Sequence, residues 1–197
     1  MVRYKANHKE QTRERIISAA ARCFKKGGYN GIGVDGLAKE AGVTSGAFYG
    51  HFTSKENAFI ESVVAGLREI HDAVLQLQAE YGARWFEVFI DFYLSTKRTC
   101  DLTEACALQA LTPEVTRSSE MVREVYQAEM IKVIDVVAKG LPQRVNTNNV
   151  DYAWTLLALL SGGVTMMRAL ADEALADQIA HNIKIMALAL IDNNVTR

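Results

Sequence analysis

One stretch limits most strongly what this chain can fold into, the run GVDGLAKEAGVTSGAFYGHFTSK between Gly33 and Lys55. In its first half, apolar residues recur at helical spacing and form one face, namely Val34, Leu37, Ala38 and Ala41. Gly42 follows directly, and glycine readily adopts the left-handed conformation in which many helices end. The stretch therefore predicts a short helix that ends in a tight, glycine-containing turn.

A second short helix is predicted after this turn. Thr44 or Ser45 can cap its start, because either side chain can accept a hydrogen bond from a free backbone N–H. Its predicted inward residues are Ala47, Phe48 and Phe52, and its predicted outward residues are Ser45, Gly46, Tyr49 and His51. Two short helices joined in this way form a helix-turn-helix, whose second helix enters the major groove of DNA. The stretch thus predicts a DNA-binding unit.

These residues and their neighbours resemble the DNA-binding domain of the tetracycline-repressor (TetR) family of bacterial regulators. The resemblance is carried by RERIISAAARCFKKGGYNGIGV and GLAKEAGVTSGAFYGHFTSKENAF, which span roughly residues 10 to 60. The shared positions are Phe24, Gly28, Ala38, Ala41, Gly42, Val43, Gly46, Tyr49, Phe52, Ser54 and Lys55. The resemblance implies an all-α fold with an N-terminal three-helix helix-turn-helix DNA-binding domain at residues 1–56. It also implies a larger helical ligand-binding and dimerisation domain at residues 57–197.

The resemblance further implies roles for residues of the second helix and its flanks. The family's residues that match Tyr49 and Lys55 contact DNA phosphates, so we expect the same of both here. Residues 44–46 lie where the recognition helix begins and meets base edges, and His51 lies nearer the DNA backbone. The complete set of candidate DNA-binding residues is Arg3, Lys5, Val34, Thr44, Ser45, Gly46, Tyr49, His51 and Lys55.

The net charge of −1 conceals an uneven distribution. Residues 1–56 contain ten Lys and Arg residues and five Asp and Glu residues, a balance of +5, and the remainder has a balance of −6. Charge alone would fit an ordinary solvated surface, but beside a helix-turn-helix it predicts phosphate binding at one end. The polar lead MVRYKANHKE supplies Arg3, Lys5 and Lys9, as a disordered tail or as a basic arm that orders in a minor groove.

Composition predicts a folded, soluble, helical protein. Of the 197 residues, 49% are hydrophobic and 23% charged, and two are proline. No run approaches the 18 or so uninterrupted apolar residues of a membrane span, and the polar N-terminus does not resemble a signal peptide. Three cysteines, Cys23, Cys100 and Cys106, form no disulfide framework. We therefore expect a cytoplasmic protein with no membrane partner.

The remaining helices follow from periodicity and caps. The first is predicted from about residue 8 to the Gly27-Gly28 pair, with Asn7 and Glu10 forming its cap. A long helix from about residue 53 to 80 is expected to belong to both domains. Further helices are predicted at about residues 84–97, 103–111, 119–139, 150–170 and 173–192, with a loop at 143–149. Thr112 is expected to cap a turn that Pro113 opens.

The last two predicted helices are apolar around much of their circumference, in LLALLSGGVTMM and IKIMALALI. Such helices must be buried on more than one side, either as the central pair of a monomer or against a partner. The family forms two-fold dimers through its last two helices, so the resemblance favours a homodimer. The candidate interface residues are Trp154, Ala158, Leu159, Gly162, Met166, Ile183, Met186 and Leu190.

Aromatic, methionine and cysteine side chains of the second domain are candidates for a ligand cavity, although each also fits plain core. They are Trp85, Phe89, Tyr93, Cys106, Met130, Trp154 and Met166. The family typically loses DNA affinity when a small-molecule inducer binds, and no residue here identifies that inducer. Cys106, placed about three residues into the helix predicted at 103–111, is either a buried structural cysteine or a thiol sensor of oxidants or electrophiles, with Cys100 as a resolving partner.

Catalysis is not expected. The four histidines are scattered, with no HExxH or Cys/His cluster, so we predict no metal and no cofactor. There is no GxSxG elbow and no phosphate-binding glycine loop. The helix-turn-helix together with the family resemblance implies a repressor that binds a palindromic operator in double-stranded DNA as a dimer and is released by a small-molecule or reactive inducer. The alternatives are the thiol sensor and a helical small-molecule-binding protein with no role on DNA.

Overall fold

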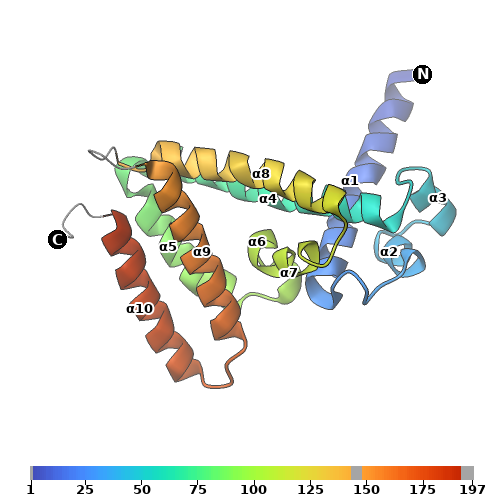
Figure 1. Cartoon of the computed structure of the whole chain (residues 1–197). Coiled ribbons are helices and arrows are strands. Elements are labelled where there is room, and N and C mark those ends of the chain that lie inside the picture. The colour runs from blue at the N-terminus through green and yellow to red at the C-terminus, as the bar shows by residue number, and fades with distance from the viewer. Residues whose placement is uncertain (1, 143–147, 192–197) are drawn as a thin grey trace. The chain divides into compact units, whose positions relative to one another are not determined.

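The computed structural model describes residues 2–142 and 148–191, and within them the chain is helical and contains no strand. The longer helices are α1 (Val2–Gly27), α4 (Lys55–Tyr81), α5 (Trp85–Thr99), α8 (Glu120–Gly140), α9 (Asn149–Arg168) and α10 (Glu173–Ile191) (Figure 1). The shorter ones are α2 (Val34–Glu40), α3 (Ser45–Tyr49), α6 (Ala107–Ala110), α7 (Thr112–Val115) and the 3-10 turns η1 (Gly82–Arg84) and η2 (Leu102–Glu104). The predicted all-α class is confirmed.

The chain folds into two compact units. Unit 1 contains Met1–Gly66 and Leu102–Tyr126, and unit 2 contains Leu67–Asp101 and Gln127–Arg197. Helices α4 and α8 each contribute residues to both units. This division is not the predicted one after residue 56, because residues 102–126 group with the helix-turn-helix. The assignment of DNA binding to residues 1–56, and of ligand binding and dimerisation to residues 57–197, stays a prediction.

The core of unit 1 is built on one face of α1. Ile16, Ala20 and Phe24 are fully buried and recur at the spacing of an amphipathic helix. Phe24 meets Phe59 of α4 edge to face, with ring centres 5.2 Å apart. The other core residues around the helix-turn-helix are Leu37, Ala38, Ala41, Phe48, Phe52 and Ala58. This core packs α2 against α1 and α3 against α2.

Unit 1 also contains a segment from much later in the chain, between η2 and the start of α8. η2 packs on α1, and α7 supplies Glu114, whose carboxylate accepts a hydrogen bond of 3.0 Å from the backbone N–H of Tyr29. Helix α6 approaches α4 closely, since a Cβ on Gly66 would lie 2.3 Å from the Cβ of Ala107. Glycine at position 66 therefore permits the α4–α6 contact.

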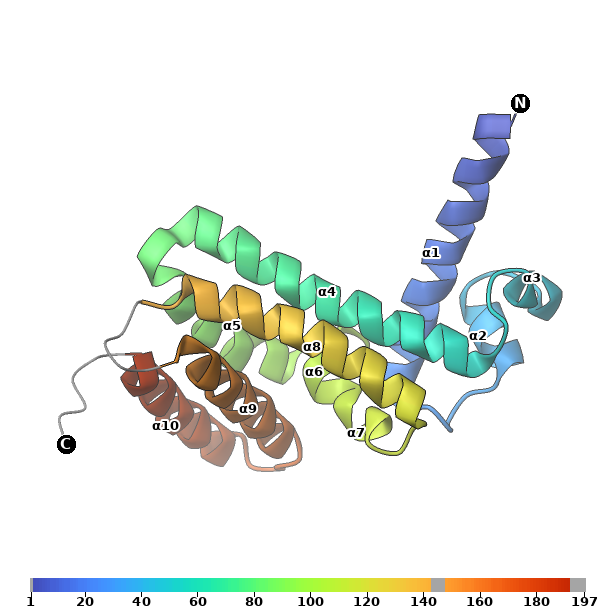
Figure 2. The ribbon, with the colours of Figure 1, turned by 45° about the horizontal axis from the view of Figure 1, so that its top comes forward.

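In unit 2, α5, α9 and α10 pack on one another, and α9 and α10 run side by side in both views (Figures 1 and 2). The indole N–H of Trp85 donates to the carbonyl of Gly140 at 2.8 Å, which ties α5 to α8. The guanidinium of Arg168 donates to the carbonyls of Lys97, Arg98 and Cys100 at 2.7–2.8 Å. It thereby satisfies acceptors at the end of α5 that have no partner within that helix.

Helix α1 begins earlier than predicted, at Val2 rather than at about residue 8. Arg3, Lys5 and Asn7 lie inside it, so Asn7 does not cap it. The lead is polar, but it consists largely of residues that tolerate a helix well and has no Gly or Pro to stop one. The side chains of Arg3 and Lys5 lie outside the described residues, as does most of the loop predicted at 143–149.

The single helix predicted at 103–111 is also wrong. Residues 102–104 form η2, and Cys106 occupies the N-cap position of the four-residue α6, before the helix rather than three residues into it. Thr112 lies within α7 and does not cap it. Its hydroxyl donates instead to the carbonyl of Leu108 at 2.5 Å. The segment therefore forms two short helical turns rather than one helix.

Two glycines of unit 1 offer a matched test of backbone conformation. Neither a Cβ on Gly42 nor one on Gly27 would meet any atom within 4 Å, but Gly42 has a φ of +64°. We expect Gly42→Ala to lower the free energy of unfolding by about 1–2 kcal/mol, because a Cβ disfavours the left-handed region. Gly27→Ala should raise it by up to about 1 kcal/mol, since Gly27 ends α1 with helical geometry.

The measurement is the urea midpoint followed by far-ultraviolet circular dichroism, with the slope of the transition unchanged. A lower midpoint in both variants would contradict the attribution of the Gly42→Ala effect to the left-handed backbone conformation of Gly42.

Candidate nucleic-acid interface

The turn between α2 and α3 is held by backbone hydrogen bonds. Gly42, with its φ of +64°, donates to the carbonyl of Lys39 at 3.0 Å, and Val43 donates to that of Ala38 at 2.9 Å. This pair of bonds satisfies the last carbonyls of α2 in the manner of a Schellman motif. Thr44 is the N-cap of α3, and its hydroxyl oxygen accepts a hydrogen bond of 3.1 Å from the backbone N–H of Ala47. The predicted glycine turn and threonine cap are both present.

Helix α3 is anchored by its aromatic residues. Phe48 and Phe52 are buried, with ring centres 5.3 Å apart. The guanidinium of Arg13 stands 5.3 Å from the ring centre of Phe52 and forms a 2.6 Å ion pair with Glu61. The opposite side of α3 is open to solvent, because Gly46 and Ala47 are exposed and Tyr49 is 57% exposed. A helix held on one side and bare on the other can lie against DNA.

Ala47 differs from its prediction as an inward residue, because it is exposed. Phe48 and Phe52, four residues apart, take the buried side of α3 and the turn after it, and a residue adjacent to Phe48 points about 100° away from that side. The small side chain of Ala47 therefore lies on the surface, next to Gly46.

Ser45 has a partner that sequence reasoning missed. Its hydroxyl donates to a carboxylate oxygen of Asp35 at 2.5 Å, which joins the start of α3 to the first turn of α2. An acidic residue at the start of α2 was visible in the sequence, but the spacing of ten residues does not reveal that the two meet. Ser45 must therefore keep or exchange this bond when a base edge approaches.

Lys55 is the first residue of α4, whose start is capped by the hydroxyl of Ser54, which accepts from the backbone N–H of Asn57 at 3.0 Å. The Lys55 ammonium lies 4.2 Å from the ring centre of Tyr29, within the range of a cation–π interaction. Burial, followed by the nearby carboxylate of Glu56, raises the pKa of Tyr29 above that of a free phenol. Tyr29 is therefore an uncharged ring beside Lys55 at neutral pH.

Three other predicted DNA-binding residues lie in the helix-turn-helix or directly after it. Val34 is half-buried at the start of α2, and Thr44 is exposed with its hydroxyl engaged in the cap. His51, predicted to face outward, is half-buried. Its buried Nδ1 has no hydrogen-bond partner among the described residues. A phosphate role for His51 stays a prediction.

The candidate ligand-lining residues belong to both units and differ in burial. Trp85, Phe89, Tyr93 and Met130 are buried in unit 2, whereas Cys106 is a buried thiol of unit 1, 7% exposed. Trp154 and Met166 are on the surface of α9, 43% and 66% exposed. Lining by these residues stays a prediction, as does the thiol sensor at Cys106, for which the buried N-cap position offers little access.

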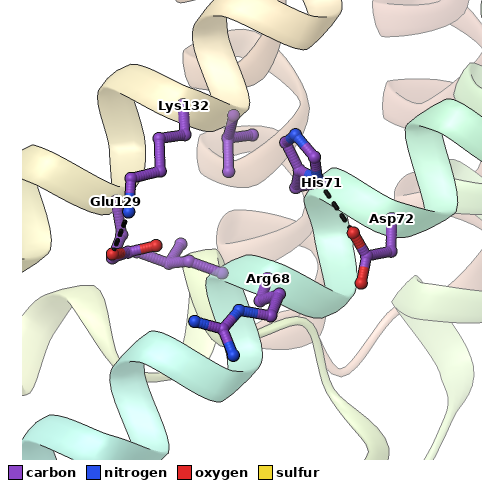
Figure 3. A pocket seen from close by; sticks show the side chains of 7 residues that line it. Arg68, His71, Asp72, Glu129 and Lys132 are labelled. Atoms are coloured by element: carbon purple, nitrogen blue, oxygen red, sulfur yellow. Dashed lines mark hydrogen bonds and ion pairs between the residues drawn. The ribbon is translucent and has the colours of Figure 1, made fainter.

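One pocket lies in unit 2, has a volume of about 170 Å³ and is lined by none of the candidate residues. Its lining comes from α4 and α8, and consists of Leu67, Arg68, His71, Asp72, Glu129, Lys132 and Val133 (Figure 3). Two pairs of side chains within it bond to each other, His71 with Asp72 at 2.9 Å and Lys132 with Glu129 at 2.5 Å. The groove is thus small and largely charged, below the usual size of about 300 Å³ or more for drug-sized ligands.

The candidate dimer residues of α9 form a stripe on its surface. Trp154, Ala158, Gly162 and Met166 recur every four residues and are exposed, and Leu159 beside them is half-buried. On α10, Met186 is 58% exposed and Leu190 is half-buried. Ile183 faces its own α9, because a Cβ on Gly163 would lie 2.2 Å from the Ile183 Cδ1 atom. The stripe is thus present, with Ile183 directed toward the α9–α10 contact.

Helix α9 is also long and apolar enough, by length and composition, to cross a membrane, although no run of uninterrupted apolar residues predicts this. Core helices of soluble proteins meet the same criterion, so the finding is weak support for a membrane span. An apolar surface of this kind equally suits a protein partner.

Comparison with known proteins agrees with this geometry. The family of bacterial regulatory proteins called the tetR family matches residues 16–61. The chain is 33% identical over 81 residues to the HTH-type transcriptional regulator AcrR of Shigella flexneri, a match that covers 41% of this chain and 38% of AcrR. It is 39% identical over 72 residues to the HTH-type transcriptional regulator TtgR of Pseudomonas putida, covering 36% and 34%. The chain therefore spans little more than a third of the length of these relatives.

The fold is shared with solved structures over nearly the whole chain. The reduced form of E. coli NemR matches with a TM-score of 0.79 at 20% identity, covering 94% of this chain and 100% of that one. A TetR-family transcriptional regulator from Agrobacterium tumefaciens matches with a TM-score of 0.72 at 17% identity, covering 90% and 98%. Residues 16–61 therefore match the helix-turn-helix segment of the tetR family of bacterial regulatory proteins, and the chain as a whole shares its fold with solved structures that include a regulator of that family.

Proposed function

We propose that this chain is a dimeric transcriptional repressor that binds a palindromic operator through α3 and is released when an inducer binds its helical body. The observation that carries the proposal is the bare face of α3, held by the Gly42 turn and the Thr44 cap. Tyr49 on that face is 57% exposed, and Lys55 begins the next helix. A phenol at the end of α3 and a cation at the start of α4 suit the phosphates that flank a major groove.

Charge supports the same proposal. The excess of five positive charges lies in residues 1–56, which contain α1, α2 and α3. Lys9, Arg15, Lys26 and Lys39 are exposed cations of this part. An even surface would be expected of a helical protein that only binds small molecules, so the asymmetry favours DNA over that alternative. The relatives are transcriptional regulators, which favours regulation over catalysis. It also favours a cytoplasmic location.

The apolar stripe of α9 supports the dimer. Trp154 and Met166 are large, exposed and aligned with Ala158 and Gly162. Small residues between large ones let a partner helix approach closely, and a two-fold axis would bring the same stripe of a second copy onto this one. The two helix-turn-helix domains of the dimer would then contact the two half-sites of one operator. The inducer is proposed to be a small or reactive molecule, and its identity and its site are left to experiment.

The first prediction concerns DNA binding itself. We expect the protein to select a palindrome with half-sites about one helical turn apart. Its log affinity should fall linearly with log salt, because each neutralised phosphate releases counterions. The measurement is selection from a random duplex library, followed by fluorescence anisotropy at several salt concentrations. Salt-insensitive binding, or no selectable sequence, would favour the small-molecule-binding alternative.

The second prediction separates positioning from specificity. Lys55→Ala should weaken binding to all duplexes alike and reduce the salt slope by about 1, and Tyr49→Phe should likewise weaken all sequences. Gly46→Lys should change the preferred base, since the nearest atom to a Cβ there is 3.8 Å away and a side chain fits. Lys139→Ala removes a cation of unit 2 as a control. Relaxed specificity in Lys55→Ala with unchanged affinity for random DNA would contradict the proposed docking.

The third prediction concerns assembly. Gly162→Glu should convert the dimer to monomer, because an unpaired charge buried in an interface costs several kcal/mol. A Cβ on Gly162 meets no atom within 4 Å in the protomer, so the protomer itself should tolerate the change. Sedimentation velocity measures the outcome. Ile131→Glu is the control, since Ile131 is 54% exposed on α8, outside the stripe. A Gly162→Glu variant that sediments as an intact dimer would place the interface elsewhere.

A further inference from the structure

We propose that Tyr29 and Glu114 are positioning residues for DNA binding, because together they hold the Lys55 ammonium where it meets a phosphate. The inference rests on the proposed function, since it deepens the role of Lys55. Contacts of the Tyr29 backbone and ring link Glu114 of α7 to Lys55 at the start of α4. All three residues belong to unit 1.

The first step is the contact between Lys55 and Tyr29. A lysine side chain is a flexible stem, and its ammonium has no fixed position unless something holds it. The Lys55 ammonium lies 4.2 Å from the centre of the Tyr29 ring, and it has no ion pair among the residues that the structure describes. The Tyr29 phenol is neutral at neutral pH, as an ordinary tyrosine is, so the ring face attracts the ammonium without neutralising its charge. The full positive charge stays available for a phosphate.

The second step is the placement of the ring itself. Tyr29 stacks on Phe24 of α1, with ring centres 5.8 Å apart, and meets Phe59 of α4 edge to face at 5.1 Å. Phe24 and Phe59 are fully buried, so the ring lies against two fixed surfaces. The side chain therefore cannot rotate away from Lys55 without losing both aromatic contacts.

The third step fixes the backbone of Tyr29. It follows Gly28, which comes directly after α1, has a φ of +72° and donates its N–H to the carbonyl of Phe24 at 3.0 Å. The carboxylate of Glu114 accepts the Tyr29 N–H at 3.0 Å through one oxygen, and its other oxygen pairs with Arg117 at 2.6 Å. The carboxylate also fills the space beside Gly28, where a Cβ would lie 3.1 Å from the Oε1 atom. Glu114 thus holds the chain at the position from which the Tyr29 ring reaches Lys55.

It follows that a change in the α7 segment alters the phosphate contact without touching DNA. Glu114 is 16% exposed and Arg117 67% exposed at the side chain, so the carboxylate is largely enclosed while its partner is accessible. Residues 102–126 would then act on DNA affinity through the position of one ammonium group.

The test is a double-mutant cycle on the full chain, measured as anisotropy of a random fluorescent duplex over a range of salt. Tyr29→Leu should weaken binding about two- to five-fold, the range of a cation–π contact, and have no further effect in the Lys55→Ala background. Tyr29→Phe keeps the ring and should bind like the wild type. Glu114→Ala should weaken binding of the duplex, because Tyr29 then loses the acceptor for its N–H. Glu114→Gln keeps an acceptor for the Tyr29 N–H and should bind the duplex like the wild type.

A second measurement reads the position of Lys55 without DNA. Mild acylation followed by mass spectrometry gives the labelling rate of Lys55 relative to that of the exposed Lys39. Tyr29→Leu should raise this ratio several-fold, and Tyr29→Phe should leave it unchanged. Thermal melts followed by circular dichroism identify any variant that loses its fold.

The outcomes separate the two proposals. Equal weakening by Tyr29→Leu in the wild-type and Lys55→Ala backgrounds, or an unchanged labelling ratio in folded Tyr29→Leu, would overturn the positioning role. Failure of the wild type to bind any duplex would overturn the proposed function instead, and the labelling ratio would still decide whether Tyr29 holds Lys55.

Discussion

The presentation of α3 depends on the left-handed backbone of Gly42. That conformation lets Gly42 and Val43 donate to the last carbonyls of α2, and it turns the chain so that Thr44 can cap the next helix. Helix α3 has five residues, too few to be stable alone, so its direction comes from this turn and from Phe48 and Phe52 beneath it. The exposed face that is proposed to meet DNA exists only because both ends of the turn are held.

Local chemistry made much of this unit predictable from the sequence. Glycine and threonine act on the backbone within a few residues, so the turn and the cap could be inferred from Gly42 and Thr44 alone. Helical periodicity likewise predicted the long helix that became α4, with Phe59 and Val63 buried. The prediction was wrong at residues 103–111. This segment has helical character, but in the structure it is divided between η2 and α6, and Cys106 lies at a helix start.

Long-range contacts could not be predicted, because no local rule connects residues so far apart. Glu114 bonds to Tyr29 across 85 positions, and in the sequence this carboxylate was one of many on predicted helix surfaces. Arg168 likewise satisfies carbonyls at the end of α5 from about 70 residues away. The Glu114–Tyr29 bond and the packing of η2 on α1 are contacts by which residues 102–126 group with the helix-turn-helix. A boundary drawn from motif and charge alone therefore could not include them.

The α9 stripe shows how sequence and structure can each constrain what the other leaves open. The sequence shows that α9 is apolar on more than one side, but not which side faces its own chain. The structure shows that Leu156, Leu160, Gly163 and Val164 are buried in the protomer while Trp154 and Met166 remain exposed. An exposed stripe of large apolar residues is unfavourable in water unless something covers it. In the proposed dimer, a second copy related by two-fold symmetry would cover it with the same stripe, and it would supply the second DNA-binding domain that a palindromic site requires.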